Sequence, residues 1–188
     1  HLAIGPLQPR VPIYVAALGP RARNLAARRA DGLLIADFAS IPYLERIVPA
    51  VRRQVREAGR DASSFPIFVR TAIEVTDNPE PVLEQRKNLM ALVHTLPGMA
   101  QQIEVPGFDV PAIMAEVRRV MHTDEVLARG GAFHELRQAG DFAAARRLIP
   151  TALVDAVSFV GPAPRIRSRL RRLAAIGVSH VFLTPPGA

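Results

Sequence analysis

Short apolar runs alternate with longer segments of helical periodicity along this chain. The apolar run of residues 11–18 ends at Gly19-Pro20, and a helical pattern follows as far as Ala30. Gly19 is placed as the N-cap and Pro20 as the first helical residue. A second apolar run, residues 33–37, leads into a helix over 42–58, with Ser40 as a candidate cap. These segments predict a βαβ unit.

Two further strands are predicted downstream, separated by a mainly helical region. Residues 67–75 are rich in β-branched side chains, and Asn78-Pro79 then caps and opens a helix that runs to about residue 96. Pro-Gly pairs break the pattern, and residues 110–157 indicate two or three helices without a strand. Gly161-Pro162 opens a helix over 165–175, and the last strand covers 178–183. Residues 97–157 are therefore expected to be a helical insertion before the last strand.

The order of these elements predicts an α/β fold with a parallel sheet. Four strands alternating with helices require helices over both faces, and a doubly wound sheet and part of a barrel both fit this pattern. A complete βα barrel needs about 250 residues and eight strands. The chain starts at His1 without a methionine and ends five residues after Leu183. We therefore expect a single domain over residues 1–188 that is cut at both ends.

Composition favours a globular cytoplasmic protein. The chain has 188 residues, 49% of them hydrophobic, with a mean hydropathy of +0.14, which is enough to bury a core. The absence of cysteine excludes disulfides and thiolate chemistry and favours a reducing compartment. No run has the length of a membrane span or the layout of a signal peptide.

The net charge of +7 comes from arginine, because Lys87 is the one lysine. Arginine binds phosphates and carboxylates bidentately, so an anionic partner is plausible. However, the arginines lie mostly on helical faces near acidic residues, as Arg52, Arg53 and Arg56 do near Glu57. No long basic run or aromatic stacking set accompanies them. We therefore interpret them as solvated helix surface and expect neither a nucleic-acid nor a membrane partner.

Motifs for the common catalytic classes are missing from the sequence. It contains no Walker loop, G-x-G-x-x-G, H-E-x-x-H or G-x-S-x-G. His134 stands at the start of a predicted surface helix, and His94 and His122 stand at helix ends, where a cation meets the helix dipole favourably. His180 lies inside the last strand, where a core position is favoured over a pocket position. No metal site is predicted.

The start of the first helix is the best-motivated binding site. Because it follows a strand, its free backbone N–H groups and its dipole favour an anion. Pro20 lacks an N–H that the helix would not have used. The alternative, that Gly-Pro only starts the helix, remains open. The residues predicted to present N–H groups are Leu18, Gly19, Arg21 and Ala22.

Several segments resemble the luciferase-like monooxygenase family, and within it the oxidoreductases that use the deazaflavin coenzyme F-420. The main one is the run from Val11 to Pro20 (VPIYVAALGP), followed by Leu25-Ala26 and by ADGLL at residues 30–34. VSFVGP at 157–162 and AAIGVSHVFL at 174–183 resemble the family's closing helix and strand. The resemblance spans nearly the whole chain.

This resemblance implies the C-terminal half of a TIM-type (β/α)8 barrel, with a helical insertion before the last strand. In the family, the Ala-Ala-x-Gly-Pro turn binds the phosphate-bearing side chain of the cofactor. Carried over to this chain, the resemblance implies that the cofactor-binding residues are Ala17, Leu18, Gly19, Arg21 and Ala22.

The family's chemistry implies hydride transfer between a small organic substrate and the ring of coenzyme F-420, which the protein orients. FMN is the alternative cofactor, as in a monooxygenase that uses reduced FMN and oxygen. The family's first four strands, which carry its acid and base residues, have no counterpart here, so no catalytic residue is predicted. A third hypothesis is a non-catalytic truncated barrel that acts as an assembly module, in which a second copy covers the open sheet edges.

Overall fold

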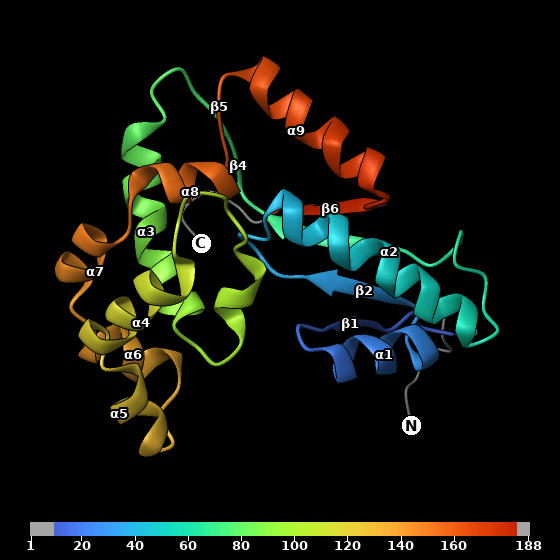
Figure 1. The fold of residues 1–188 in the computed structure, drawn as a ribbon, viewed down its shortest axis with the longest axis horizontal. Helices are drawn as coiled ribbons and strands as arrows, with labels where there is room; N and C mark the ends of the chain where they lie inside the picture. Colours follow the sequence, from blue (N-terminus) through green and yellow to red (C-terminus); the bar gives the residue numbers. More distant parts are fainter. Residues whose placement is uncertain (1–9, 184–188) are drawn as a thin grey trace, which may run out of the picture.

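A four-stranded parallel sheet with helices on one face is the framework of the structure, a computed structural model that describes residues 10–183. In chain order this framework consists of β1 (Tyr14–Ala16), α1 (Pro20–Arg29), β2 (Gly32–Ile35), α2 (Ile41–Glu57), β3 (Ile67–Thr71), α9 (Ala163–Ile176) and β6 (His180–Leu183). Helix α2 packs between α1 and α9 (Figure 1). The predicted alternation of strands and helices is confirmed.

The strands follow one another across the sheet in the order β1-β2-β3-β6, and every neighbouring pair is parallel. A doubly wound sheet reverses its strand order at a switch point. The order here runs in one direction, as it does around a βα barrel. Of the two architectures that the sequence left open, the barrel segment is therefore the one observed, and β1 and β6 are its edges.

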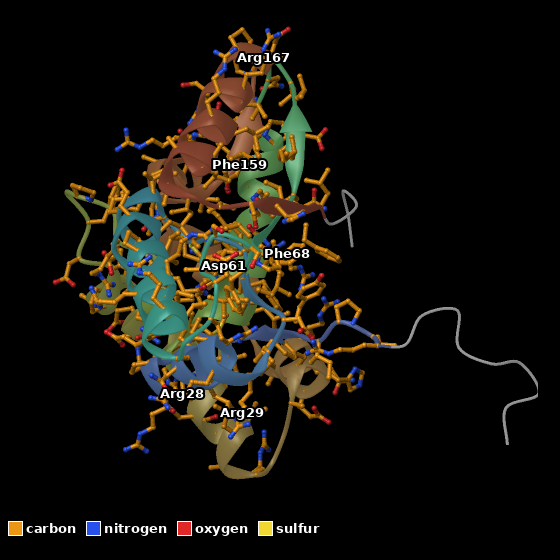
Figure 2. The ribbon with its side chains drawn as sticks, turned by 90° about the vertical axis from the view of Figure 1, so that its right-hand side faces the viewer. Arg28, Arg29, Asp61, Phe68, Phe159 and Arg167 are labelled. Carbon is orange, nitrogen blue, oxygen red and sulfur yellow. The ribbon has the colours of Figure 1, made fainter. Side chains whose placement is uncertain are left out.

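One face of the sheet is buried beneath the helices and the other is open. Leu33 and Ile67 point toward the helices and are fully buried, whereas Tyr14 on the opposite face is 49% exposed. Figure 2 shows Phe68 on the side of the sheet away from α2. The exposed His180 stacks on the Phe68 ring there, with the ring centroids 4.5 Å apart. The expectation that His180 is a core residue is therefore wrong.

The insertion forms a second body beside the carboxyl ends of the strands (Figure 1). It contains β4 (Ile73–Val75), α3 (Glu80–His94), a 3-10 turn (Met99–Gln102), α4 (Val110–Val120), α5 (Thr123–Ala128), α6 (Phe133–Ala139), α7 (Phe142–Leu148), α8 (Thr151–Val157) and β5 (Phe159–Gly161). Its own core includes Met90, Val117 and Leu153, all fully buried. The insertion expected over residues 97–157 is helical throughout its regular elements, and the body it belongs to also takes in β4, α3 and β5.

Local details of the insertion differ from the predictions. The strand expected over 67–75 is two strands divided at Ala72, because β3 pairs with β6 whereas β4 pairs with β5. Strand β5, which has three residues and pairs with β4, was not predicted. Residues 110–157 form five helices rather than two or three, since Gly130 and Gly140 end turns that periodicity alone would join. Asn78 does not cap α3; Pro79 occupies the N-cap position without a side-chain bond.

Ser40 connects α2 to the insertion. As predicted, it is the N-cap of α2, and its Oγ accepts a hydrogen bond from the Tyr43 N–H at 3.3 Å. The same oxygen accepts from the Glu104 N–H at 2.9 Å, and the Ser40 N–H donates to the Gln102 carbonyl at 2.9 Å. One buried side chain thus satisfies backbone groups of both bodies.

We predict that Ser40→Ala lowers the free energy of unfolding by about 2 kcal/mol, because two backbone N–H groups lose their acceptor. Urea unfolding monitored by circular dichroism measures this change. The matched control is Ser168→Ala on the exposed face of α9, which should change stability by less than about 0.5 kcal/mol. Equal effects of the two substitutions would contradict the role of Ser40.

Candidate functional site

The carboxyl ends of β1, β2 and β3 meet at one edge of the sheet, where three loops and the insertion come together. Parallel strands place these ends on the same side, and in βα barrels that side carries the active site. The loop after β1 begins at Ala17, and the loop after β2 runs from Asp37 to Ser40. From the insertion, Gly98 lies against Leu18, since a Cβ added to Gly98 would sit 3.6 Å from Leu18 Cδ2.

The first turn of α1 has the features of an anion-binding site. Gly19 is the N-cap with φ −79° and ψ 161°, it makes no side-chain cap, and the first turn contains no acidic residue. The first backbone hydrogen bond runs from the Arg23 N–H to the Gly19 carbonyl at 3.0 Å. The N–H groups of Arg21 and Ala22 therefore have no backbone acceptor within residues 10–183, and both residues are exposed. A phosphate group fits this arrangement.

The structure places the five residues implied by the resemblance next to one another, with different contacts. The Ala17 N–H donates to the Leu34 carbonyl at 3.3 Å, so Ala17 closes the strand pairing and does not offer a free donor. Gly19 faces open space, because a Cβ there would meet nothing within 4 Å. Leu18 and Gly19 are half-buried, and the helix start that follows them is exposed.

Arg23 is a neighbour of this site that the sequence did not single out. Its Nη1 donates to the Leu18 carbonyl and lies 3.4 Å from the Tyr43 hydroxyl. Burial raises the pKa of Tyr43, against the opposing effect of the Arg23 and Arg46 charges. Arg23 thus holds the loop in place with a cation one turn inside the helix. In the sequence, Arg23 looks like the arginines on exposed helix faces, so no pattern predicted its contact with the loop.

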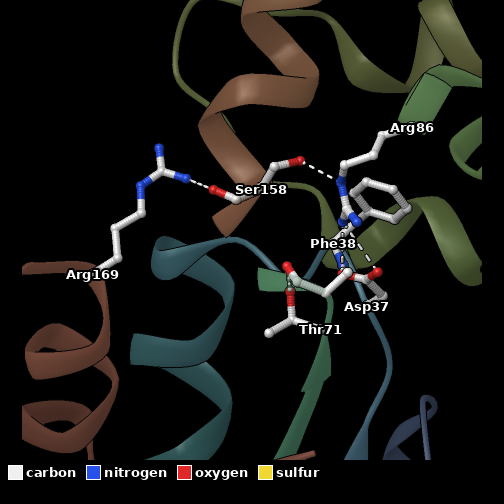
Figure 3. Close-up of polar contacts among 7 residues, drawn as sticks. Asp37, Phe38, Thr71, Arg86, Ser158 and Arg169 are labelled. Carbon is white, nitrogen blue, oxygen red and sulfur yellow. Dashed lines mark hydrogen bonds and ion pairs between the residues drawn. The ribbon is translucent and has the colours of Figure 1, made fainter. Parts of the chain in front are cut away.

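A buried ion pair holds the loop after β2 (Figure 3). Arg86 Nη2 of α3 lies 3.1 Å from both carboxylate oxygens of Asp37, and Arg86 Nε donates to Ser158 Oγ at 2.9 Å. The two charged side chains are only 8% and 13% exposed. Arg169 Nη1 donates to the Ser158 carbonyl. This network joins β2, α3, the start of β5 and α9.

Phe38 adopts a backbone conformation that is unusual for a bulky residue. Its φ is +62°, in the left-handed region that normally favours glycine. The Phe38 N–H donates to Asp37 Oδ1 at 2.8 Å, and the Arg86 guanidinium carbon lies 4.4 Å from the ring centroid. The side chain is 2% exposed. These contacts offset the strain of the conformation, and such strain is commonly found at functional sites.

His94 lies beneath this loop in a fully buried position. Its Nδ1 donates to the Met99 carbonyl at 3.1 Å, and the ring meets Phe38 edge-on at 5.3 Å between centroids. Burial lowers the pKa of His94 from 6.5 to about 4, against the raising effect of the bond to Met99. The sequence placed His94 correctly at a helix end, but its expected role as a cation is wrong because the buried ring is neutral at pH 7.

A surface hollow of about 470 Å³ lies beside the site, between the start of α2 and the insertion. Its lining includes Pro42, Val105 and Phe108, and an ion pair between Arg46 and Glu104 forms part of its wall. Apart from this ion pair and Gln101, the residues that line the hollow are apolar.

Residues 10–183 contain no helix that is both long and apolar enough to cross a membrane. In the same residues, no three His, Asp or Glu side chains gather as metal ligands would.

The fold is that of half a βα barrel, with an uncapped helix start after one strand and a helical insertion before the last. The model of the luciferase-like monooxygenase family matches residues 1–180 of this chain. The chain therefore belongs to the luciferase-like monooxygenase family, as the sequence motifs implied.

Two characterised relatives show the range of similarity. The chain is 23% identical over 177 residues to 5,10-methylenetetrahydromethanopterin reductase of Methanopyrus kandleri. The aligned region covers 94% of this chain and 45% of the reductase. It is 32% identical over 78 residues to an F-420-dependent glucose-6-phosphate dehydrogenase of Nocardia farcinica. This aligned region covers 41% of this chain and 23% of the dehydrogenase. The chain thus spans about half the length, or less, of these relatives.

Solved structures agree with the fold. The F-420-dependent tetrahydromethanopterin reductase from Methanopyrus kandleri superposes with a TM-score of 0.61 at 20% identity, over 92% of this chain and 44% of that one. An F-420-dependent secondary alcohol dehydrogenase superposes with a TM-score of 0.60 at 16% identity, over 93% and 43%. At these identities the likeness shows the fold, the C-terminal half of a TIM-type barrel.

We predict that Asp37→Asn and Arg86→Met each lower the free energy of unfolding by about 3–5 kcal/mol, because each leaves one buried partner unpaired. Combining the two substitutions should cost about 1–3 kcal/mol less than the sum of the single effects. Urea unfolding of the four proteins provides the measurement. Glu57→Gln, in the exposed pair with Arg53, is the control and should cost less than about 1 kcal/mol. Strictly additive losses would refute the coupling.

We also predict a loss of stability on mild acidification that depends on His94. The unfolded chain takes up a proton below pH 6.5, whereas folded His94 does so only near pH 4. Stability is therefore present in full above pH 6.5 and falls as pH drops toward 4, by about 2 kcal/mol between pH 7 and pH 5. Urea unfolding at both pH values should show this loss in the wild type and a smaller one in His94→Gln. An equal loss in both proteins would assign it to other groups.

Proposed function

We propose that this chain forms the phosphate-side half of a coenzyme F-420 pocket, in an oxidoreductase that moves a hydride to or from a small organic substrate. The observation that carries the proposal is the start of α1, where free N–H groups, a positive dipole end and an uncapped Gly19 lie at the end of β1. The named dependence of several relatives on coenzyme F-420 supports the choice of cofactor.

Each residue of the site has a distinct role in this proposal. The N–H groups of Arg21 and Ala22 donate to the cofactor phosphate, and the exposed Arg21 guanidinium adds positive charge. Gly19 leaves the approach open because it has no side chain. Arg23 fixes the Leu18 carbonyl, so the loop is rigid before the ligand arrives. When bound, the deazaflavin ring supplies the hydride chemistry.

The insertion supplies the other wall. The Asp37–Arg86 pair and the Ser40 bonds hold the loop after β2 against residues 98–104. No acid or base is assigned among residues 10–183 in this proposal.

FMN is the second candidate cofactor, because it carries the same kind of phosphate on a polyol chain. One superposing structure, a riboflavin lyase described with modified FMN, has a TM-score of 0.50. An anion-binding helix start accepts a phosphate group on either cofactor.

The proposal is tested by titrating the protein with coenzyme F-420 and with FMN while following cofactor fluorescence. We expect saturable binding of coenzyme F-420. Gly19→Asp should weaken it at least about tenfold, a change of about 1.4 kcal/mol, because its carboxylate repels the phosphate. Gly19→Ala is the matched control: its methyl group meets nothing within 4 Å, and it should leave the affinity within about threefold.

Other outcomes redirect the proposal. Preference for FMN would make the protein a flavin-type member of the family. Binding of neither cofactor, together with a dimeric mass in solution, would support the non-catalytic assembly module, in which a second copy covers the edges β1 and β6. Equal binding by Gly19→Asp and Gly19→Ala would move the cofactor away from α1.

A further inference from the structure

Arg70 stands out on the open face of the sheet. In β3, Ile67, Val69 and Thr71 are buried under the helices, so Phe68 and Arg70 point to the opposite side. Phe68 contributes to an aromatic row there, with its ring 4.7 Å from Tyr14 and 4.5 Å from His180. Arg70 lies one row closer to the carboxyl ends, in register with Phe182 of β6.

A charge at this position is unusual for the fold. The corresponding face of a βα barrel is its interior, which is normally filled with layers of apolar side chains. A charged group inside such a layer requires a counter-charge or a bound polar ligand. Arg86 has Asp37 for this purpose, whereas residues 10–183 supply no hydrogen-bond or ion-pair partner for the Arg70 guanidinium.

The position of Arg70 relative to α1 narrows the choice of ligand. Strand β3 is two strands away from β1 in the sheet, which corresponds to roughly 10 Å. A cofactor whose phosphate rests at the start of α1 and whose chain lies across β2 would bring its other end to β3. The group at that end is the flavin-type ring, whose pyrimidine edge presents carbonyl oxygens and ring nitrogens as acceptors.

We propose that Arg70 contacts this ring edge and stabilises negative charge on it, an inference that rests on the proposed function. The planar guanidinium has five N–H donors and suits an edge with adjacent acceptors. A cation beside a flavin-type ring also changes its electronic properties. Arg70 and the α1 start thus bind the two ends of one cofactor.

The test compares the wild type with Arg70→Met and Arg70→Lys, and with Arg171→Met as the matched control. Arg171 is likewise exposed, but it lies on the outer helix α9. Affinity for oxidised coenzyme F-420 is measured by fluorescence titration, and the visible absorption band of the bound cofactor is recorded at saturation. Urea unfolding of each variant is measured in the absence of cofactor.

We expect Arg70→Met to weaken binding about ten- to a hundredfold, as the loss of a charged hydrogen bond does. The band of the bound cofactor should move toward that of the free cofactor, a change that a purely structural role would not produce. The affinity of Arg70→Lys should fall between those of the wild type and Arg70→Met, and the affinity of Arg171→Met should match that of the wild type. The unfolding free energy of Arg70→Met should change by less than about 0.5 kcal/mol, since the exposed guanidinium makes no hydrogen bond or ion pair with residues 10–183.

Two results for Arg70→Met would overturn this inference, and one result for the wild type would overturn it together with the proposed function. One is wild-type affinity and an unchanged band in Arg70→Met, while Gly19→Asp still loses binding; the proposed function would then stand without it. The other is a loss of stability in Arg70→Met with an unchanged band for the cofactor still bound, which would assign Arg70 to structural pairing. If the wild type binds neither coenzyme F-420 nor FMN, the proposed function fails and this inference fails with it.

Discussion

Parallel pairing of β1, β2, β3 and β6 is the constraint on which the rest of the structure depends. Because all four strands run in the same direction, their carboxyl ends, and hence the starts of the following helices, lie at one edge. A single edge thus carries a positive helix end at Gly19, the strained loop at Phe38 and the connection from β3 into the insertion. An antiparallel sheet would have distributed these features over two edges.

The insertion depends on this edge and also stabilises it. Parallel sheets leave polar loops at the ends of their strands, and burying such loops requires partners for every polar group. Here α3 supplies Arg86 to Asp37, and the 3-10 turn supplies a backbone acceptor to Ser40. The left-handed Phe38 is stable only because these partners are in place. Contacts within the chain therefore fix the conformation of the loop after β2 without any ligand.

Features predicted from the sequence are those encoded within a few neighbouring residues. The strand-to-helix junction at Gly19-Pro20 and the cap at Ser40 depend on local geometry, and both are observed. The Asp37–Arg86 pair could not be predicted, because its members are 49 residues apart and each resembles an ordinary surface charge. Strand β5 and the buried, neutral His94 were missed for the same reason: pairing and burial depend on contacts with distant segments.

One face of the sheet is covered by helices, and the other face is open. Helices of the chain itself cover the first face, so the side chains on it contribute to packing. The open face carries the aromatic row of Tyr14, Phe68 and His180 and, nearer the carboxyl ends, Arg70. A row of rings is readily covered by apolar side chains from elsewhere in a barrel, whereas a guanidinium needs an acceptor. The charge thus distinguishes two parts of this face: the aromatic row, which other parts of a barrel can cover, and the level where the strands end, which is where ligands enter a βα barrel.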